Sequence, residues 1–368
     1  MLVGRGDLKF AREELTQVAD ATAAAELPHL RCAVLLTLAN ADSKQGLAAD
    51  ERERLAEAAE IAQQVGDRRL EILVAFELAN VRAWFDREAA AAVDDLRDAL
   101  ERARAYGDRP LLTEACMRLG SELYNLGLLT GAEEQFEQAV ALAGEEGSHR
   151  DEARATTLLG RVKYLRGEVA LAEELAMQAL DWLERTGDTF LQIQNLRWLS
   201  RYEIDRGDLD CAEKRLRDAL PLALEVGGWL TIDIYRHLAE VLVRSGRIED
   251  ARELVAFAAR SIPEEDHYAR AAHLVGEAIV ATGGGESTTA ATAFAEALRL
   301  MEEQELVIDV AETRIELARS LRAFGDLGGA RAELERARAA FVRMEARAMV
   351  EQIDQELAEL AEQTDAIV

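Results

Sequence analysis

Proline and aromatic residues are scarce in this chain. Four of the 368 residues are proline, and phenylalanine, tryptophan and tyrosine together make up 5%. Because β-strands favour aromatic and β-branched side chains, this composition argues against a β-sheet. Alanine, leucine, glutamate and arginine dominate instead, and all four have high helix propensity. The composition therefore predicts an all-α protein.

Cysteine and histidine are also rare, and their spacing argues against metal sites. Cys32, Cys116 and Cys211 each lie in a helical pattern among alanine and leucine, so we expect three buried, reduced thiols. None of the five histidines has a second histidine four residues away or a cysteine at ligand spacing. Nucleophile elbows and a His-Asp-Ser order are missing too. We therefore expect no cofactor, no metal and no enzymatic activity.

Long apolar runs and positive charge are lacking as well. The chain contains no run of 18 apolar residues and no charged N-terminal region followed by an apolar core, so neither a membrane span nor a signal peptide is expected. Its 70 acidic and 43 basic residues give a formal charge of −27. Such a surface repels nucleic acid and anionic membranes. The expectation is a soluble, cytoplasmic protein that binds neither nucleic acid nor membrane directly.

What the sequence does have is a repeat of about 40 residues. Glycine marks each period, Arg87 stands in the one missing place, and alanine follows five residues after almost every mark; the glycines are Gly6, Gly46, Gly127, Gly167, Gly207, Gly246, Gly285 and Gly325. A period of this length is typical of stacked helical repeats. It predicts one continuous array over residues 1–368 rather than two or three globular domains.

Each repeat is predicted to be a helical hairpin. After Gly167, apolar residues recur at spacings of three and four, and this pattern stops at Gly187 and Asp188, which are a typical helix end and helix cap. A second apolar pattern then continues from Leu191 to Tyr202. Repeating this unit predicts a half repeat over 1–26, eight helical hairpins over 27–343 and a C-terminal capping helix over 344–363.

The hairpin motif resembles the tetratricopeptide repeat. Gly120, Gly127, Ala132, Phe136 and Ala139 match that repeat position by position. The period here is about 40 rather than 34 residues, and the usual proline after the second helix remains only as Pro263. The long-period form is similar to the sensor arrays of MalT-like regulators and other STAND-type signalling ATPases, and to arrays beside LuxR-type DNA-binding domains. The resemblance implies a right-handed α-solenoid of stacked antiparallel hairpins.

Two places depart from the regular repeat. The array begins inside a unit, since Gly6 to Ala11 reads as the turn and start of a second helix, which we interpret as a piece of a larger protein or, alternatively, an unusual cap. The triplet Gly283 to Gly285 could be a phosphate loop, but no Lys-Ser/Thr pair follows it and no strand precedes it. An inter-helix turn is the better interpretation.

A ligand is expected on the concave surface, which the resemblance assigns to the first helix of each hairpin. Projection of these helices places four arginines and several aromatic and polar residues in the central groove: Tyr124, Asn125, Arg161, Tyr164, Arg197, Trp198, Arg201, Arg236 and His237. Arginine binds carboxylate and phosphate through paired hydrogen bonds, so these residues are candidate ligand-binding residues. The alternative is that the arginines only balance nearby acids, namely Glu203, Asp205, Asp233 and Glu240.

The predicted function is therefore binding. The leading hypothesis is a non-catalytic scaffold that forms the sensor or interaction region of a bacterial signalling or transcription-regulating ATPase. The alternative is a free-standing adaptor or peptide-pheromone receptor. The expected partner is a protein or peptide segment or a small anionic effector, and other domains of a longer parent protein are further candidate partners.

Overall fold

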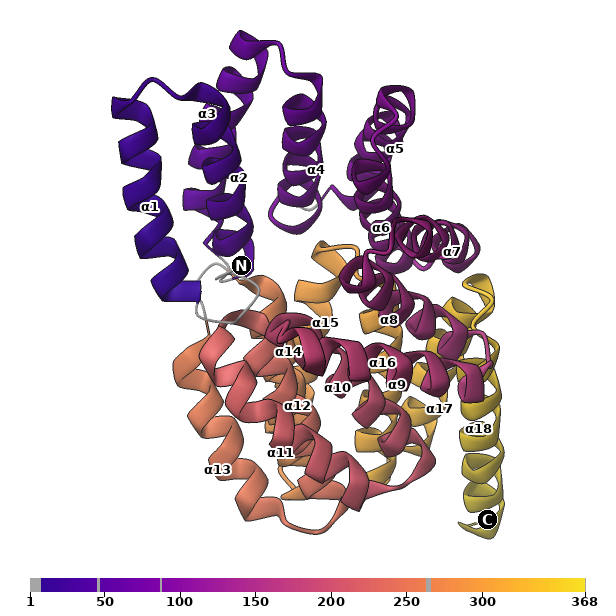
Figure 1. Cartoon of the computed structure of the whole chain (residues 1–368). Helices are drawn as coiled ribbons and strands as arrows, with labels where there is room; N and C mark the ends of the chain where they lie inside the picture. Colours follow the sequence, from indigo (N-terminus) through magenta and orange to yellow (C-terminus); the bar gives the residue numbers. More distant parts are fainter. Residues whose placement is uncertain (1–7, 45–46, 87, 263–265, 368) are drawn as a thin grey trace.

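The computed structural model describes residues 8–44, 47–86, 88–262 and 266–367. Within these ranges the chain forms eighteen α-helices and no β-strand (Figure 1). The bounds of the helices are Leu8–Ala24 (α1), Pro28–Lys44 (α2), Ala48–Val65 (α3), Arg68–Trp84 (α4), Ala89–Tyr106 (α5), Arg109–Asn125 (α6), Leu129–Glu146 (α7), His149–Leu165 (α8), Val169–Thr186 (α9), Thr189–Arg206 (α10), Leu209–Val226 (α11), Gly228–Arg244 (α12), Ile248–Ala258 (α13), His267–Gly283 (α14), Ser287–Glu303 (α15), Val307–Ala323 (α16), Leu327–Arg343 (α17) and Arg347–Ile367 (α18). A short 3-10 segment, Ala259–Ser261, extends α13.

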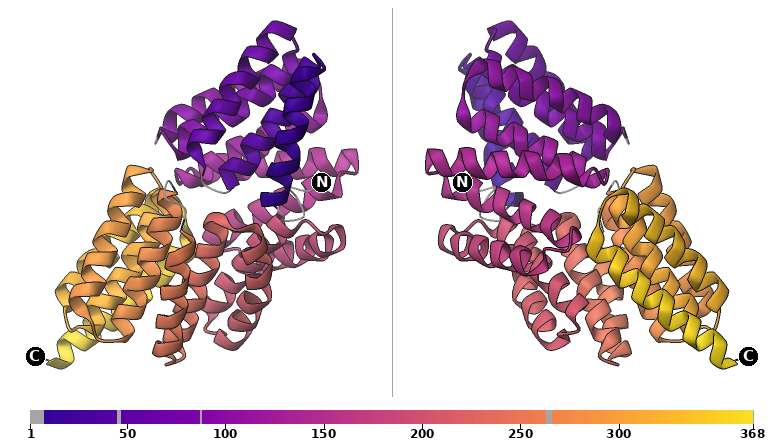
Figure 2. Two further views of the ribbon diagram at one scale, coloured as in Figure 1. Left: turned by 90° about the vertical axis from the view of Figure 1, so that its left-hand side faces the viewer. Right: turned by 90° about the vertical axis from the view of Figure 1, so that its right-hand side faces the viewer.

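The helices pack as antiparallel hairpins in a right-handed α-solenoid, which is the fold class that the repeat predicts (Figures 1 and 2). Helix α1 comes first, the pairs α2/α3 to α16/α17 follow, and α18 packs on α17. One hydrophobic cluster extends from Ala41 on α2 to Leu360 on α18, which supports a single array. The repeat markers Gly6, Gly46 and Arg87, and also Pro263, lie outside the described residues.

The hairpin turns have the glycine and aspartate geometry that the sequence predicts. Gly187 has a φ of 69° and ends α9, and the side chain of Asp188 accepts the backbone N–H of Leu191 at the start of α10. Glycine favours this left-handed conformation because it has no Cβ. Gly283 is the last residue of α14, and Gly284 and Gly285, the latter with a φ of 76°, form the turn to α15.

The solenoid closes on itself through contacts between its two halves. Glu345, in the turn between α17 and α18, contacts the Arg166 guanidinium at 3.2 Å and the Thr130 hydroxyl at 3.3 Å. Met344 packs against Gly127. At a second place, Glu305 accepts the backbone N–H of Ala90 at 3.4 Å, where the orange helices meet the purple ones in Figure 2. We call these interactions the closing contacts; they join hairpins that are far apart in the sequence.

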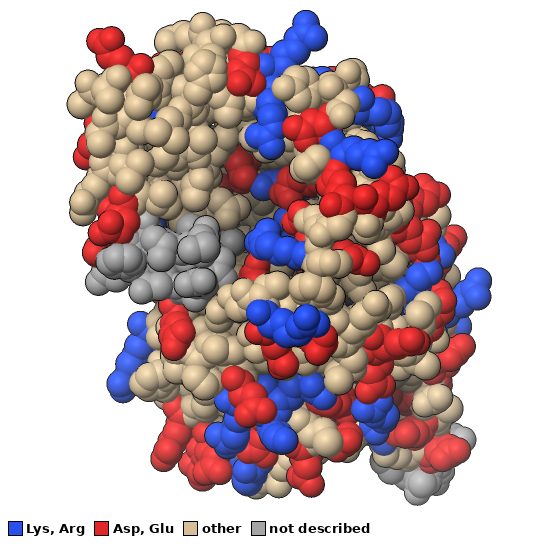
Figure 3. Space-filling view, viewed as in Figure 1, with Lys and Arg blue, Asp and Glu red and all other residues tan. Residues whose placement is uncertain are grey.

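The surface is unevenly charged. The face formed by α1 to α3 carries few charged side chains, whereas acidic and basic side chains alternate over most of the other helices in this view (Figure 3). No helix in the described ranges is both long and apolar enough to cross a membrane. The described histidine, cysteine, aspartate and glutamate residues form no cluster of three or more that could hold a metal ion.

One expectation about the cysteines is wrong. Cys32 and Cys116 are buried, but Cys211 is exposed. Cys211 lies in the first turn of α11, where Asp208 caps the helix by accepting the Cys211 backbone N–H. The neighbouring repeat position, Ala212, takes the buried place instead. The hydrogen bond to Asp208 raises the pKa of the Cys211 thiol.

Candidate ligand cavity

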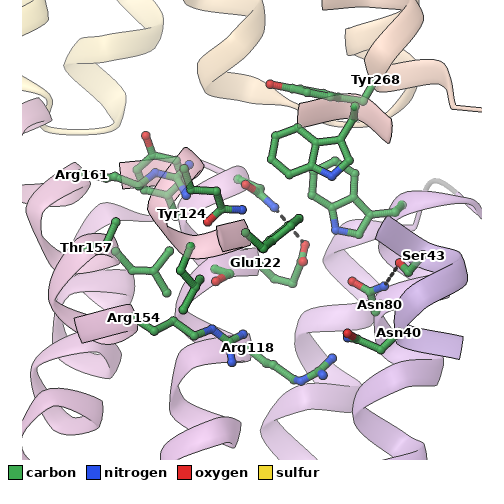
Figure 4. Close-up of a pocket in the computed structure, with 18 of the residues that line it drawn as sticks. Asn40, Ser43, Asn80, Arg118, Glu122, Tyr124, Arg154, Thr157, Arg161 and Tyr268 are labelled. Carbon is green, nitrogen blue, oxygen red and sulfur yellow. Dashed lines mark hydrogen bonds between the residues drawn. The ribbon is translucent and has the colours of Figure 1, made fainter. Parts of the chain in front are cut away.

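The concave side of the array contains a cavity of about 530 Å³. Its lining comes mainly from the first helices of the hairpins, α2, α4, α6, α8, α10, α12, α14 and α16. Figure 4 shows how side chains from separate hairpins point into the same space. The volume lies in the range of pockets that hold small molecules.

The structure brings six of the nine candidate residues to this cavity and leaves three outside its lining. Those that line it are Tyr124, Asn125, Arg161, Arg197, Trp198 and Arg236. Tyr164, Arg201 and His237 do not contribute to its lining. The projection of helix faces thus identified the side of the array that lines the cavity. It did not distinguish side chains that reach the cavity from side chains that bind neighbouring residues instead.

Arg161 lies at the centre of an aromatic and cationic cluster. It is on α8, between α6, which carries Tyr124, and α10, which carries Trp198. The guanidinium carbon of Arg161 is 4.2 Å from the centre of the Tyr124 ring and 4.5 Å from that of the Trp198 ring. Arg197 contacts the same Trp198 ring at 4.4 Å. Such cation–π contacts hold a guanidinium in place while its edge stays available for hydrogen bonding.

Arg197 and Arg236 share one buried carboxylate. Asp233 on α12 lies 2.8 Å from Arg197 and 3.0 Å from Arg236, and its side chain is fully buried. Burial opposes the ionisation of Asp233, but the two arginines outweigh it and lower the pKa of the carboxyl. Both arginines therefore have an acidic partner inside the protein.

His237 is a buried structural residue next to this group. Its Nδ1 lies 2.8 Å from the carbonyl oxygen of Asp233, and its Nε2 lies 3.1 Å from Arg236. A carbonyl oxygen only accepts, so Nδ1 carries the proton and Nε2 accepts from Arg236. Burial, together with Arg236, holds the pKa of His237 well below its usual range. The ring is thus neutral, and both of its nitrogens have a hydrogen-bond partner.

Arg201 and Tyr164 belong to a second internal network. Arg201 forms an ion pair with Asp205 on the same helix and contacts Glu240 on α12 at 3.3 Å. The Tyr164 hydroxyl donates to Asp205, and its ring stacks on Tyr202 with a centre-to-centre distance of 4.6 Å. For Arg197, Arg201 and Arg236, charge balance by nearby acids is therefore the observed arrangement. Glu203, the remaining acid considered for this role, pairs with Arg215 instead.

Arginines on the other side of the cavity are also paired. Arg118 on α6 contacts Glu77 on α4 and Glu114 on its own helix, and Glu114 also accepts from Arg154 at 2.7 Å. Figure 4 shows Arg118 and Arg154 extending along the same edge of the cavity. Burial opposes ionisation of Glu114, but Arg154 and Arg118 outweigh it and lower its pKa to about 2.

Four acids of the lining form no ion pair with another described residue: Glu122, Asp266, Asp309 and Glu312. Burial raises the pKa of Glu122 to about 7 and that of Glu312 to about 7, and it raises the pKa of Asp309 as well. Hydrogen bonds from Asn125, at 3.4 Å, and from Trp84 only partly offset the effect of burial on Glu122. Asp309 and Glu312 are both on α16. The cavity therefore presents uncompensated groups of both signs.

Sequence reasoning missed an aromatic wall of the cavity. Tyr268 on α14 contacts the Trp84 ring at 6.0 Å and the Trp229 ring at 5.5 Å, both edge to face, and Trp229 contacts Phe190 at 6.3 Å. All four side chains line the cavity. Phe190, Trp229 and Tyr268 are each the second residue of a first helix, and the projection did not include this position.

Comparison with known proteins supports the fold. No family model and no curated protein sequence matches this chain. Similar solved structures include a Rap protein complexed with competence and sporulation factor, with 16% identity and a TM-score of 0.66 over 96% of this chain and 99% of that chain. The Rap conjugation gene regulator of plasmid pLS20, in complex with the Phr* peptide, has 14% identity and a TM-score of 0.65 over 91% and 96%. Aspartyl phosphate phosphatase F from Bacillus subtilis has 13% identity and a TM-score of 0.60 over 91% and 94%.

These neighbours are helical repeat proteins of the tetratricopeptide type, and the match extends over nearly the whole of each chain. At such low identity the likeness concerns the fold alone. This chain has a tetratricopeptide-like repeat fold, as its glycine and alanine spacing predicts.

Proposed function

We propose that this protein is a non-catalytic scaffold that binds a short peptide or protein segment in the central cavity. The observation that carries this proposal is the cavity itself, which eight hairpins line. Two solved structures with the same fold are Rap proteins in complex with a Phr* peptide and with competence and sporulation factor. The Phr* peptide is bound by a protein of this fold, which supports a peptide as the class of ligand here.

The charge pattern favours a peptide over a purely anionic effector. A small anion would meet the unpaired carboxyl groups of Glu122, Asp309 and Glu312 in the same cavity as Arg161. A peptide carries groups of both signs together with apolar side chains, and the wall formed by Trp84, Trp229 and Tyr268 offers apolar area for the latter.

The role in a signalling pathway is a separate part of the proposal. The match along 96% and 99% of the two Rap chains supports a free-standing peptide receptor. The sensor region of a STAND-type, transcription-regulating ATPase is the second proposal. The sequence of the full-length gene decides between them, because the second requires a nucleotide-binding domain on the same polypeptide.

A cavity-filling substitution tests the proposed site. Gln194 is half-buried and lines the cavity, whereas Gln192, on the same helix, is half-buried but outside the lining. A library of random pentapeptides is incubated with each purified protein, and retained peptides are identified by mass spectrometry. We expect retention by the wild type and by Gln192→Trp, and loss of retention in Gln194→Trp, with the thermal midpoint of each variant reported alongside. Failure of the wild type to retain any peptide, or equal retention by both variants, contradicts the proposal.

A further inference from the structure

We infer that Arg161 is the residue that binds a carboxylate of the peptide ligand; this inference rests on the proposed function. Six arginines line the cavity, and within the described part of the chain Arg161 alone among them forms no ion pair. Each of the other five pairs with an acid of the protein, and Arg197 and Arg236 share Asp233. Arg161 is therefore the one lining arginine that an anionic group of a ligand can meet without displacing an acid of the described part of the protein.

The surroundings of Arg161 are built to hold its side chain in one position. Contacts with the Tyr124 and Trp198 rings fix the guanidinium plane, and both rings are at least nine-tenths buried. The Nε of Arg161 and the hydroxyl of Tyr124 are both buried and have no hydrogen-bond partner in the described structure. Buried polar groups almost always have a hydrogen-bond partner, so the N–H of Arg161 and the O–H of Tyr124 are two donors for which an acceptor is missing.

A carboxylate suits this position better than a phosphate does. The guanidinium presents parallel N–H groups that match the two oxygens of a planar carboxylate. A phosphate group carries up to two negative charges and would need a second free cation. The unpaired acids Asp309 and Glu312 on α16 would also repel a doubly charged group more strongly. The carboxylate can come from the C-terminus of the peptide or from an aspartate or glutamate side chain.

The experiment separates these two sources. Random pentapeptides are made with a free or an amidated C-terminus, and each form is made with and without aspartate and glutamate, which gives four libraries. Each library is incubated with the wild type, Arg161→Gln, Arg161→Lys and the control Arg217→Gln. Arg217 is exposed on α11 and pairs with Glu213, so its loss leaves the cavity unchanged.

We expect the wild type to retain peptides only from libraries that contain a carboxylate. Retention from the free-terminus library without aspartate and glutamate identifies the C-terminus as the source, and retention from the amidated library with these residues identifies a side chain. Affinity for the best retained peptide should fall by roughly ten- to a hundredfold in Arg161→Gln, in line with a charged hydrogen bond, and by less in Arg161→Lys. Arg217→Gln should bind like the wild type, and thermal midpoints show whether each variant is folded.

Two outcomes overturn the inference in different ways. In the first, the wild type retains amidated peptides that lack aspartate and glutamate, and Arg161→Gln binds them with equal affinity. The cavity then binds peptides without a carboxylate contact, so the proposed function stands and this inference fails. Retention of no peptide from any library by the wild type removes the proposed function and this inference together.

Discussion

At the scale of single residues, the close packing of two helices depends on which positions are glycine. A Cβ added to Gly120 on α6 would lie 2.6 Å from Cε1 of Phe136 on α7. Phe136 is fully buried, so it has no room to move away. A Cβ at Gly144, on the same hairpin, would meet nothing closer than 3.8 Å, the Oε1 atom of Glu152. Glycine is thus required at the first position and only permitted at the second.

This difference gives matched substitutions with opposite effects. Gly120→Ala should lower the free energy of unfolding by about 1 to 3 kcal/mol, because the methyl group overpacks the contact with Phe136. Gly144→Ala should raise it by about 0.5 to 1 kcal/mol, because alanine loses less backbone entropy in a helix. Urea denaturation followed by circular dichroism measures both. Equal midpoints for the two variants would show that the Gly120 contact is not tight in solution.

At the scale of the elements, three helix ends depart from the usual glycine. Glu26, Glu305 and Glu345 have φ values of 55°, 56° and 61°, whereas glycine takes the left-handed conformation at most other turns. A side chain in this conformation costs about 1 to 2 kcal/mol. Glu305 and Glu345 are also the residues that make the closing contacts. At these two positions, the strained backbone supplies a carboxylate that reaches the other half of the array.

Replacing these glutamates by glycine distinguishes the effect of backbone strain from the effect of the closing contacts. Glu26→Gly should raise the free energy of unfolding by about 0.5 to 1 kcal/mol, the relief of strain less the added entropy of glycine. Glu345→Gly relieves the same strain but removes the contacts with Arg166 and Thr130. We expect faster amide hydrogen exchange in α18 for Glu345→Gly and unchanged exchange there for Glu26→Gly. Unchanged exchange in both variants would mean that the closing contacts do not hold α18 in place.

At the scale of the whole molecule, buried acids with shifted pKa values dominate the dependence of stability on pH. Burial raises the pKa of Glu51 to about 8, with the nearby Glu77 adding to the shift. Glu122 and Glu312, in the cavity, have pKa values of about 7, whereas that of Glu114 is about 2. The first three carboxyl groups keep a proton in the folded state at pH values where the unfolded chain has lost it.

The sign of the effect follows from proton linkage. From about pH 5 to pH 8 the folded state holds more protons at Glu51, Glu122 and Glu312 than the unfolded state does, so stability falls as pH rises. Below about pH 4.5 the ionised Glu114 must be protonated, and stability falls again as pH decreases. We therefore expect a maximum of the thermal midpoint near pH 5. Glu51→Gln should flatten the decline between pH 6 and pH 8, and an unchanged profile in this variant would refute the assignment.

The sequence by itself determined the repeat, the hairpin and the side of the array that faces the cavity. These features depend on local rules: glycine and aspartate end and begin helices, alanine and glycine allow close packing, and apolar spacing defines a helix face. Because these rules act within one hairpin, they suffice to place Tyr124, Arg161 and Trp198 on one surface, and all three line the cavity.

The tertiary structure alone decided which of those side chains remain free. Arg197 and Arg161 lie on the same side of successive first helices. Arg197 pairs with Asp233 from the next hairpin, whereas Arg161 stacks on aromatic rings and forms no ion pair within the described residues. The exposure of Cys211 and the closing contacts of Glu345 were likewise invisible in the sequence. The physical reason is that helix periodicity fixes the direction of a side chain, whereas ion pairing and burial depend on groups about 40 or about 180 residues away, brought within a few ångströms by the turn of the superhelix.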